Sequence, residues 1–336
     1  MIDLRSDTVT KPTKEMRAAM AGANVGDDVY GEDPSVNALQ TYCSNLLRKE
    51  AALYCPSGTQ SNLIALLTHC GRGDEYIVGN QAHTYKYEGG GAAVLGSIQP
   101  QPIELTEKAV MPLEALKAAI KPDDIHFAKS RLVCLENTYG GRVMPLDHPA
   151  EIRTICDQYG LSLHLDGARL FNAVVKTGET ASDLTKDFDT VSICLSKGLG
   201  APMGSVLVGS QDFIEKAKHW RKMLGGGMRQ AGMMAAGGLF ALKNQVDRLL
   251  EDHQNAECLA EGLQGVKGVE VDIERVETNM VFVNVDQKVR DQLDKLASLT
   301  GLVLPTGLEM RLVLHLDITR EDVEKVIEIF HQASRK

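Results

Sequence analysis

The chain has 336 residues, with 36 Lys and Arg against 45 Asp and Glu, which gives a formal charge of −9 at pH 7. Nucleic-acid binding is disfavoured, because a DNA- or RNA-coating domain needs a basic excess or a dense basic stripe. Hydrophobic residues make up 43% and charged residues 24% of the chain, which is typical of a globular protein and excludes disorder. The length predicts roughly two domains.

The seven cysteines are odd in number and never form a C-x-x-C pair, which disfavours a disulfide framework and a zinc knuckle. Asp3, Arg5 and Asp7 are charged residues within the first seven positions, so the N-terminus does not have the pattern of a signal peptide. No uncharged apolar run reaches the roughly 18 residues of a membrane span. We therefore expect a cytoplasmic protein.

From its N-terminus, the chain predicts a polar arm over residues 1–12, an acidic loop at 26–34, and then strands alternating with helices. Asp33-Pro34 is typical of a helix start, with an N-cap followed by Pro at the first helical position. Alternating strands and helices imply a mostly parallel sheet covered on both faces, whose functional groups lie at the carboxyl ends of the strands. Expected strands are 51–54, 75–79, 131–136, 161–166 and 190–196, with helices at 34–49, 59–69, 112–120 and 147–159.

The periodicity changes after residue 210. Two long helices are expected at 211–223 and 229–265, the second broken near 244, followed by strands at 269–273, 279–285 and 310–316 and helices at 287–299 and 319–333. Thr319 and Asp322 form a plausible capping box for the last helix. The change predicts a smaller α+β domain at 251–336, after an arm and large domain at 1–250.

The segment CPSGTQSN (55–62) connects an apolar strand to a helix through Ser57, Gly58 and Thr59. Free backbone N–H groups and the helix dipole make such a turn a phosphate seat, because Gly permits close approach and the hydroxyl groups add donors. The alternative interpretation is that Ser57 or Thr59 only caps the helix.

Asp166 ends the apolar strand of LHLDGAR (163–169), directly before Gly167. A carboxylate at a strand end can keep a heteroaromatic nitrogen protonated. His164 alternates with Asp166 and is expected on the same face of the strand, so the two could also bind a metal. A third interpretation is that Asp166 is an ordinary N-cap.

Lys197 follows an apolar strand and precedes a glycine-rich turn in SICLSKGLGAP (192–202). Most lysines are solvated surface charges, but partial desolvation at the end of a buried strand favours the neutral amine, which attacks carbonyl groups. The glycines complete neither a dinucleotide-binding fingerprint nor a P-loop. Four further polar residues, His83, His126, Arg169 and Arg311, are not distinguished by the pattern alone.

A phosphate seat, a strand-end carboxylate and a strand-end lysine match one cofactor, pyridoxal 5′-phosphate. Their order resembles the fold-type I, aspartate aminotransferase-like pyridoxal enzymes, and within them the low-specificity L-threonine aldolase family. The resemblance covers nearly the whole chain and is carried by these blocks: DLRSDTVT (3–10), VGDDVYGEDP (25–34), PSGTQSNL (56–63), HLDGARLFNA (164–173), LSKGLGAPMGS (195–205), RKMLGGGMRQAG (221–232), TNM (278–280) and RLVLH (311–315).

This resemblance implies roles for the cofactor-binding residues. Lys197 would bond covalently to the cofactor aldehyde, Asp166 would pair with the ring nitrogen, and His83 would stack on the ring. Ser57, Gly58 and Thr59 would seat the phosphate. Metal ligands are not implied.

For the substrate, the resemblance implies that Ser6 and Arg311 bind the carboxylate, Arg311 as a bidentate fork. Arg169 would reach either the ring hydroxyl or the substrate carboxylate. Lys222 and Arg229 would reach an active site of a neighbouring subunit, because sites in this family lie at the dimer interfaces of a homotetramer.

The reaction implied is retro-aldol cleavage of L-threonine and L-allo-threonine to glycine and acetaldehyde, through an external aldimine and a quinonoid. His83, His126 or a bound water would accept the β-hydroxyl proton. One departure is Tyr139, where members of the family often have a histidine, and both substrate diastereomers are therefore expected to react.

Rival interpretations keep part of this picture. A β-eliminating lyase or a serine hydroxymethyltransferase-like enzyme would share the cofactor. A metal-dependent aldolase or hydrolase would use His126, His164 and Asp166. A non-catalytic scaffold is disfavoured by the presence of both Lys197 and Asp166.

Overall fold

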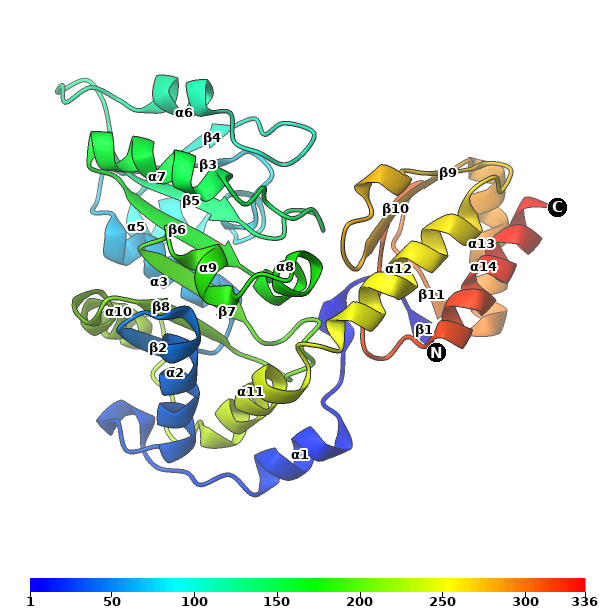
Figure 1. Cartoon of the computed structure of the whole chain (residues 1–336), viewed down its shortest axis with the longest axis horizontal. Coiled ribbons are helices and arrows are strands. Elements are labelled where there is room, and N and C mark those ends of the chain that lie inside the picture. Colours follow the sequence, from blue (N-terminus) through cyan, green and yellow to red (C-terminus); the bar gives the residue numbers. More distant parts are fainter. Residues whose placement is uncertain (336) are drawn as a thin grey trace.

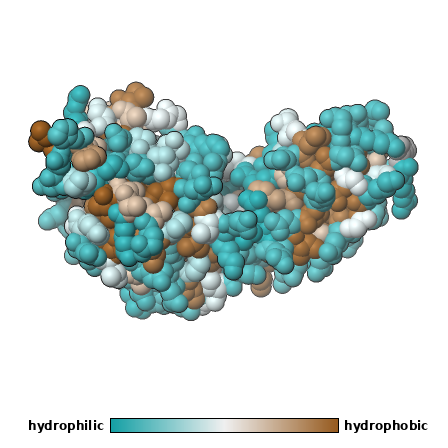
Figure 2. Space-filling model, turned by 90° about the horizontal axis from the view of Figure 1, so that it is seen from above, coloured by the Kyte–Doolittle hydropathy of each residue, from teal (hydrophilic) through white to brown (hydrophobic). Residues whose placement is uncertain are grey.

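The computed structural model describes residues 1–335, which form a large and a small body connected by the long helix α12 (Leu249–Leu263) (Figure 1). Seen from above, the two lobes are joined by a narrower waist (Figure 2). The hydrophobic core of the large body includes Leu249 at the start of α12. The core of the small body includes Ala256 and Leu259, further along the same helix. The helix therefore ties the two cores together.

The large body contains a seven-stranded sheet in which five neighbouring strands run parallel. Strands β2 and β7 each pair antiparallel with β8 between them. The predicted mostly parallel α/β sheet is therefore confirmed. In spatial order the strands are β2 (Ala51–Cys55), β8 (Ser205–Gly209), β7 (Thr190–Cys194), β6 (Ser162–Gly167), β5 (Lys129–Glu136), β3 (Asp74–Gly79) and β4 (Gln99–Ile103).

Helices cover this sheet and bury its apolar strands. The helices of the large body are α1 (Lys14–Ala21), α2 (Pro34–Leu47), α3 (Gly58–His69), α4 (His83–Lys86), α5 (Gly91–Gly96), α6 (Leu113–Ala119), α7 (His148–Tyr159), α8 (Leu170–Thr177), α9 (Ala181–Thr185), α10 (Gln211–Met223) and α11 (Gly232–Asn244). The expected break near 244 is confirmed by the gap between α11 and α12.

The small body is built on a three-stranded antiparallel sheet, β12 (Glu309–Val313), β10 (Met280–Val285) and β9 (Val269–Val271). Helices α12, α13 (Gln287–Thr300) and α14 (Arg320–Ser334) pack against it. Thr319 and Asp322 form the predicted capping box of α14. The predicted start of α2 is also confirmed, because Asp33 caps it and Pro34 is its first residue.

The N-terminal arm does not belong to the large body alone. Its first strand, β1 (Ile2–Asp3), pairs parallel with β11 (Leu302–Val303), so Ile2 and Leu4 are buried in the core of the small body. In Figure 1 the N-terminus accordingly lies beside β11. The sequence predicted that the arm belongs with the large domain at 1–250. In the structure the first residues of the arm pack with the small body instead, because their apolar side chains are buried against the C-terminal segment.

Strands β4 and β8 were not predicted. Strand β4 contains Pro100 and Pro102, and proline is tolerated only because β4 lies at the edge of the sheet. Strand β8 directly follows a glycine-rich turn and runs opposite to its neighbours. Within residues 1–335, no helix is both long and apolar enough to cross a membrane.

Candidate active site

The predicted functional groups converge where the parallel strands end. Asp166 is the last residue but one of β6, Glu136 ends β5, and Lys197 follows β7. Glu136 and Lys197 line a cavity of about 980 Å³ that also borders the small body. The Asp166 carboxylate lies within 4.8 Å of the ring of His83, which lines the same cavity. The cavity is lined by Arg5, Gln81, His83, Tyr87, Glu136, Tyr139, Gly140, Ala168, Arg169, Lys197, Arg275, Met280, Phe282, Pro305, Thr306 and Arg311.

Lys197 is half-buried in this cavity. Its backbone carbonyl accepts a hydrogen bond from the Thr10 hydroxyl at 3.0 Å, which ties the N-terminal arm to the turn after β7. Within residues 1–335, its amine forms no ion pair. The amine is therefore available for a carbonyl group.

The segment 55–62 connects β2 to α3 and contains the N-cap of that helix. Ser57 is the N-cap of α3 and accepts the Gln60 N–H, so the capping interpretation holds for its hydroxyl. Gly58 begins the helix, and a Cβ at Gly58 would lie 3.4 Å from the Ser205 hydroxyl. That hydroxyl is buried and has no partner within residues 1–335. An unpaired buried hydroxyl beside a helix N-terminus suits an anion such as phosphate.

Asp166 is buried and accepts two hydrogen bonds. The Ala168 backbone N–H donates to one oxygen at 3.0 Å, and the Asn62 amide donates to the other at 2.9 Å. His164 contacts the same Asn62 side chain, so His164 and Asp166 share one face as predicted. A lone pair of the carboxylate remains for a further donor.

The metal alternative is not supported, because its three residues do not meet in one chain. His126 precedes the start of β5, whereas Glu136 at the other end of β5 lies in the cavity. That strand spans roughly 23 Å at ~3.3 Å per residue. The carboxylates of Glu88 and Asp166 do lie within 4.8 Å of the His83 ring, but hydrogen bonds to Asn62 and His83 account for this cluster.

His83 is fixed by two carboxylates. Its backbone N–H donates to Glu136 at 2.8 Å, and its Nδ1 lies 2.9 Å from Glu88. The hydrogen bond to Glu88 raises the pKa of His83, against the opposing effect of burial. The Tyr87 ring lies 5.8 Å away at a tilt of 41°. The imidazole is therefore held at the cavity wall in one orientation.

Glu136 brings a second acid into the cavity. Burial and the negative charge of Asp166 raise its pKa to about 7. It therefore changes charge near neutral pH, beside Lys197. Sequence reasoning did not single out this residue.

Arg169 and Arg311 occupy different positions. Arg169 donates from Nε and Nη2 to the two oxygens of Asp7, which is completely buried. Arg311 forms no ion pair within residues 1–335, and partial burial followed by the charge of Arg169 lowers its pKa. Arg311 therefore has a free guanidinium fork, whereas that of Arg169 is occupied.

Ser6 does not line the cavity, although its neighbour Arg5 does. The Ser6 hydroxyl accepts hydrogen bonds from the backbone and side chain of Thr8. The Ser6 hydroxyl keeps its own proton for a further acceptor, and its contact with a substrate carboxylate stays a prediction.

Apart from Ser6, seven predicted residues are not among those that line this cavity: Ser57, Gly58, Thr59, Asp166, His126, Lys222 and Arg229. His126 is exposed beside Asp124. Lys222 borders a separate surface hollow with Tyr30, and Arg229 pairs with Asp27. His126 precedes β5, whereas Glu136 at the other end of that strand lies in the cavity. The role of His126 stays a prediction.

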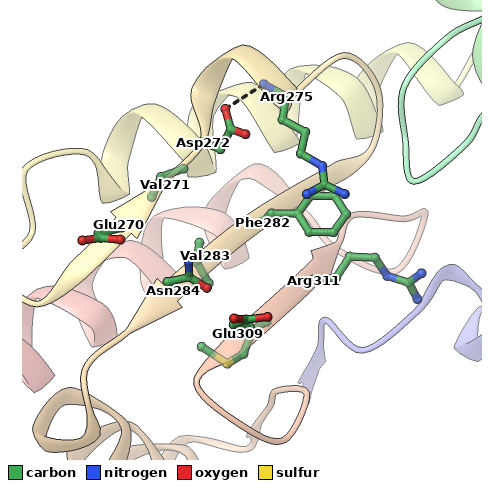
Figure 3. Close-up of a pocket in the computed structure, with 10 residues that line it drawn as sticks. Glu270, Val271, Asp272, Arg275, Phe282, Val283, Asn284, Glu309 and Arg311 are labelled. Carbon is green, nitrogen blue, oxygen red and sulfur yellow. Dashed lines mark hydrogen bonds between the residues drawn. The ribbon is translucent and has the colours of Figure 1, made fainter. Parts of the chain in front are cut away.

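A second hollow of about 580 Å³ continues from the cavity over the sheet of the small body. Figure 3 shows Arg275 lying over the ring of Phe282 and, on the neighbouring strand, the side chain of Arg311. These three residues line both hollows. Side chains of β10 and β12 thus form the wall that faces Lys197.

Sequence reasoning missed several groups that only their neighbours make important: Asp7, Asn62, Glu88, Glu136 and Ser205. Three of them lie inside the blocks that carried the family resemblance, namely Asp7, Asn62 and Ser205. Their place in those blocks was the signal in the sequence that could have identified these three residues. No feature of the neighbouring sequence distinguished Glu88 or Glu136.

Comparison with known proteins is consistent with this geometry. Residues 3–288 match the beta-eliminating lyase family. The chain belongs to that family, in its threonine aldolase branch. The low specificity L-threonine aldolase of Escherichia coli (strain K12) is 52% identical over 326 residues, 97% of each chain. Low-specificity L-threonine aldolase 1 of Arabidopsis thaliana is 45% identical over 99% of this chain and 96% of its own.

Solved structures support the fold of this beta-eliminating lyase family member. The threonine aldolase of Leishmania major matches with a TM-score of 0.84 at 21% identity, over 99% of this chain and 100% of that one. Serine palmitoyltransferase of Sphingomonas wittichii matches with a TM-score of 0.79 at 20% identity, over 99% and 87%. The predicted fold-type I architecture is thereby confirmed.

Proposed function

We propose that the protein uses pyridoxal 5′-phosphate to cleave L-threonine and L-allo-threonine into glycine and acetaldehyde. The observation that carries the proposal is that Asp166 lies near the end of β6, Lys197 follows β7 and the N-terminus of α3 follows β2, three strands whose carboxyl ends lie at the same end of the sheet. Its relatives named low-specificity L-threonine aldolase support the choice of reaction.

The groups present fit this cofactor. The unpaired Lys197 amine suits its aldehyde and the Asp166 carboxylate its ring nitrogen. The free N–H groups of Gly58 and Thr59 and the unpartnered Ser205 hydroxyl suit its phosphate. His83, held beside Asp166 by its hydrogen bond to Glu88, would cover the ring face.

When bound, the cofactor supplies an electron sink for the bonds of the amino acid's α-carbon. The bond that breaks is the one held perpendicular to the ring plane, so the residue that clamps the carboxylate selects it. Arg311 has the free fork for that clamp. The guanidinium of Arg169 already binds Asp7. We therefore assign Arg169 to the cofactor and not to the substrate carboxylate.

His83 is the candidate within the chain for orienting the β-hydroxyl group or accepting its proton. Its Nδ1 faces Glu88, so a neutral ring keeps its proton there and leaves Nε2 as the acceptor. His126 remains a candidate only if another subunit supplies it.

A homotetramer with sites at dimer interfaces fits the surface of this chain. His126 lies between Ile125 and Phe127, whose residues are 97% and 49% exposed. Exposed apolar side chains on both sides of His126 suit a loop that packs against another subunit. Lys222 and Arg229 are exposed and available for the same purpose.

The seven cysteines are all free, which fits the reducing conditions of the cytoplasm. There the enzyme would serve threonine breakdown and glycine formation.

The experiment is to reduce the purified enzyme with borohydride and locate the cofactor adduct by mass spectrometry, which we expect on Lys197. Lys197→Ala should bind cofactor only noncovalently and make no product, while Lys176→Ala, at the end of α8, should behave like wild type. An adduct on another side chain contradicts the cofactor assignment.

The reaction is tested separately with L-threonine, L-allo-threonine and D-threonine. Acetaldehyde and glycine should form from the L substrates only. Formation of ammonia and a keto acid, without acetaldehyde, would identify an eliminating lyase instead.

A further inference from the structure

A buried chain of hydrogen bonds through side chains of α3, β6 and β7 leads to the carboxylate of Asp166. Asn62, on the second turn of α3, is 2% exposed. Its amide nitrogen lies 2.9 Å from Asp166 Oδ2 and 2.9 Å from Glu88 Oε1. Its amide oxygen lies 3.3 Å from His164 Nε2. Every polar atom of the Asn62 side chain therefore has a partner.

The chemistry of these partners fixes the direction of each hydrogen bond. Ionised carboxylates only accept, so the amide nitrogen must face Asp166 and Glu88 and the amide oxygen must face His164. His164 Nε2 consequently carries a proton that it donates to Asn62. A flipped amide would place its oxygen against two carboxylates.

The same argument extends the chain by two residues. Burial lowers the pKa of His164 to about 3 and that of His69 to about 4, so both rings are neutral at physiological pH. With its proton on Nε2, His164 accepts at Nδ1 from the Thr190 hydroxyl, 2.9 Å away. The Thr190 oxygen in turn accepts from His69 Nε2 at 2.8 Å. All four donors point from His69 towards the carboxylates.

This chain of hydrogen bonds ends at a point where three carboxylates lie close together. Asp166 lies close to Glu88 and Glu136, whose pKa values are raised by burial and, in addition, by the negative charge of Asp166. Carboxylates this close together repel one another. Besides the Ala168 backbone N–H, Asn62 is the only donor to Asp166 within residues 1–335. A donor fixed between the two carboxylates offsets the repulsion.

We propose that Asn62 is a positioning residue that holds the Asp166 carboxylate in the orientation needed to bind the protonated ring nitrogen of the cofactor, with His164 fixing the orientation of the Asn62 amide. The inference rests on the proposed role of Asp166 and deepens it. It explains why an uncharged histidine lies buried behind the site.

The test is ¹⁵N NMR of enzyme loaded with pyridoxal 5′-phosphate labelled at its ring nitrogen, since the chemical shift reports whether that nitrogen is protonated. Asn62→Leu removes both donors at similar volume. It should move the signal towards the unprotonated value at pH 8 and weaken cofactor binding about tenfold, the equivalent of one hydrogen bond to a charged group. Asn62→Ala, which removes both N–H donors and adds no other donor, replaces it if Asn62→Leu does not fold.

The matched control is Ser61→Ala. Ser61 is also buried on α3 and accepts a hydrogen bond from Ser192 at 2.7 Å, but it does not contact Asp166. Its ring-nitrogen signal should equal that of wild type. His164→Phe should shift the signal in the same direction as Asn62→Leu, by less, because the amide keeps its donors but loses its fixed orientation.

An unchanged signal in the Asn62 variant, or an equal change in Ser61→Ala, overturns the inference. An unchanged signal in His164→Phe overturns the part assigned to His164. Asp166→Asn distinguishes a failure of the proposed role of Asp166 from a failure of the role inferred for Asn62. A ring nitrogen that stays protonated in Asp166→Asn overturns the proposed role of Asp166 itself, whereas its loss there but not in Asn62→Leu overturns only the role of Asn62.

Discussion

Asp7 holds Arg169 through two hydrogen bonds, Nε to Oδ2 at 2.8 Å and Nη2 to Oδ1 at 2.6 Å. Asn279, at the edge of the small body, donates to the same carboxylate at 3.3 Å. The N-terminal arm therefore joins the large and the small body at the border of the cavity. Burial alone would raise the pKa of Asp7, but Arg169 outweighs it and brings the pKa to about 2.

Asp7→Asn should destabilise the protein by about 3–5 kcal/mol at pH 7, because it leaves a buried guanidinium without its partner. The contribution of Asp7 is present above its unfolded pKa near 3.8 and is lost as the pH falls through about 2. Urea unfolding at pH 7 measures the change. Asp3→Asn, which affects an exposed ion pair with Arg5, should change little. Equal effects of the two substitutions would contradict the role of Asp7.

Arg311→Lys should raise KM for L-threonine about tenfold or more, because lysine cannot bind a carboxylate in a bidentate manner. Arg169→Lys should act mainly on stability and kcat, because its fork is bound to Asp7. Steady-state kinetics of the two variants separates these effects. A larger rise of KM in Arg169→Lys would reassign the carboxylate clamp.

Glu136→Gln should change how stability depends on pH. The folded-state pKa of Glu136 is raised to about 7 by burial, so the native state binds more protons than the unfolded state between pH 4.5 and 7. Stability from this group is therefore present below pH 4.5 and is lost as the pH rises through 7. The free energy of unfolding of Glu136→Gln relative to wild type should accordingly increase from pH 5 to pH 8.

The control for this measurement is Glu114→Gln, whose side chain on α6 is 87% exposed. Its difference from wild type should not vary over the same range. A constant difference for Glu136→Gln as well would show that Glu136 is already ionised at pH 5.

Ser205→Ala should weaken cofactor binding roughly ten- to a hundredfold, corresponding to about 1.5–3 kcal/mol for a hydrogen bond to a charged group. The cofactor-free protein should not lose stability, because the hydroxyl is buried without a partner there. Cofactor titration and urea unfolding measure the two quantities. Ser182→Ala, which removes a buried hydroxyl bonded to Thr180, should leave cofactor affinity unchanged. A destabilised cofactor-free Ser205→Ala would show that the hydroxyl has a structural role.

Tyr139→His should alter the ratio of kcat/KM for L-threonine to that for L-allo-threonine by about fivefold or more, since one lost or gained polar contact discriminates at this level. Tyr139 lines the cavity beside Glu136, where it can contact the β-substituent. Tyr159→His, at the exposed end of α7, is the control. An unchanged ratio would place the discrimination elsewhere.

Much of the fold followed from local patterns. Short apolar runs indicated the parallel strands β3, β5, β6 and β7, and Asp33-Pro34 and Thr319 indicated two helix starts. Strand β4 was missed because its prolines are compatible with a strand only at the sheet edge, and edge position is a tertiary property. The pairing of β1 with β11 joins residues 300 positions apart, beyond the reach of any local signal.

The sequence by itself determined the residues whose chemistry follows from their own type and position: Lys197 and Asp166 after apolar strands, and Gly58 at a helix start. Only the tertiary structure decided which groups surround them. Asn62, Glu88, Glu136 and Ser205 acquire their properties from neighbours supplied by other elements, and the Arg169 fork is occupied because the chain terminus folds over it. The physical reason is that hydrogen bonding, desolvation and Coulomb interactions act over a few ångströms in space, whatever the separation along the chain.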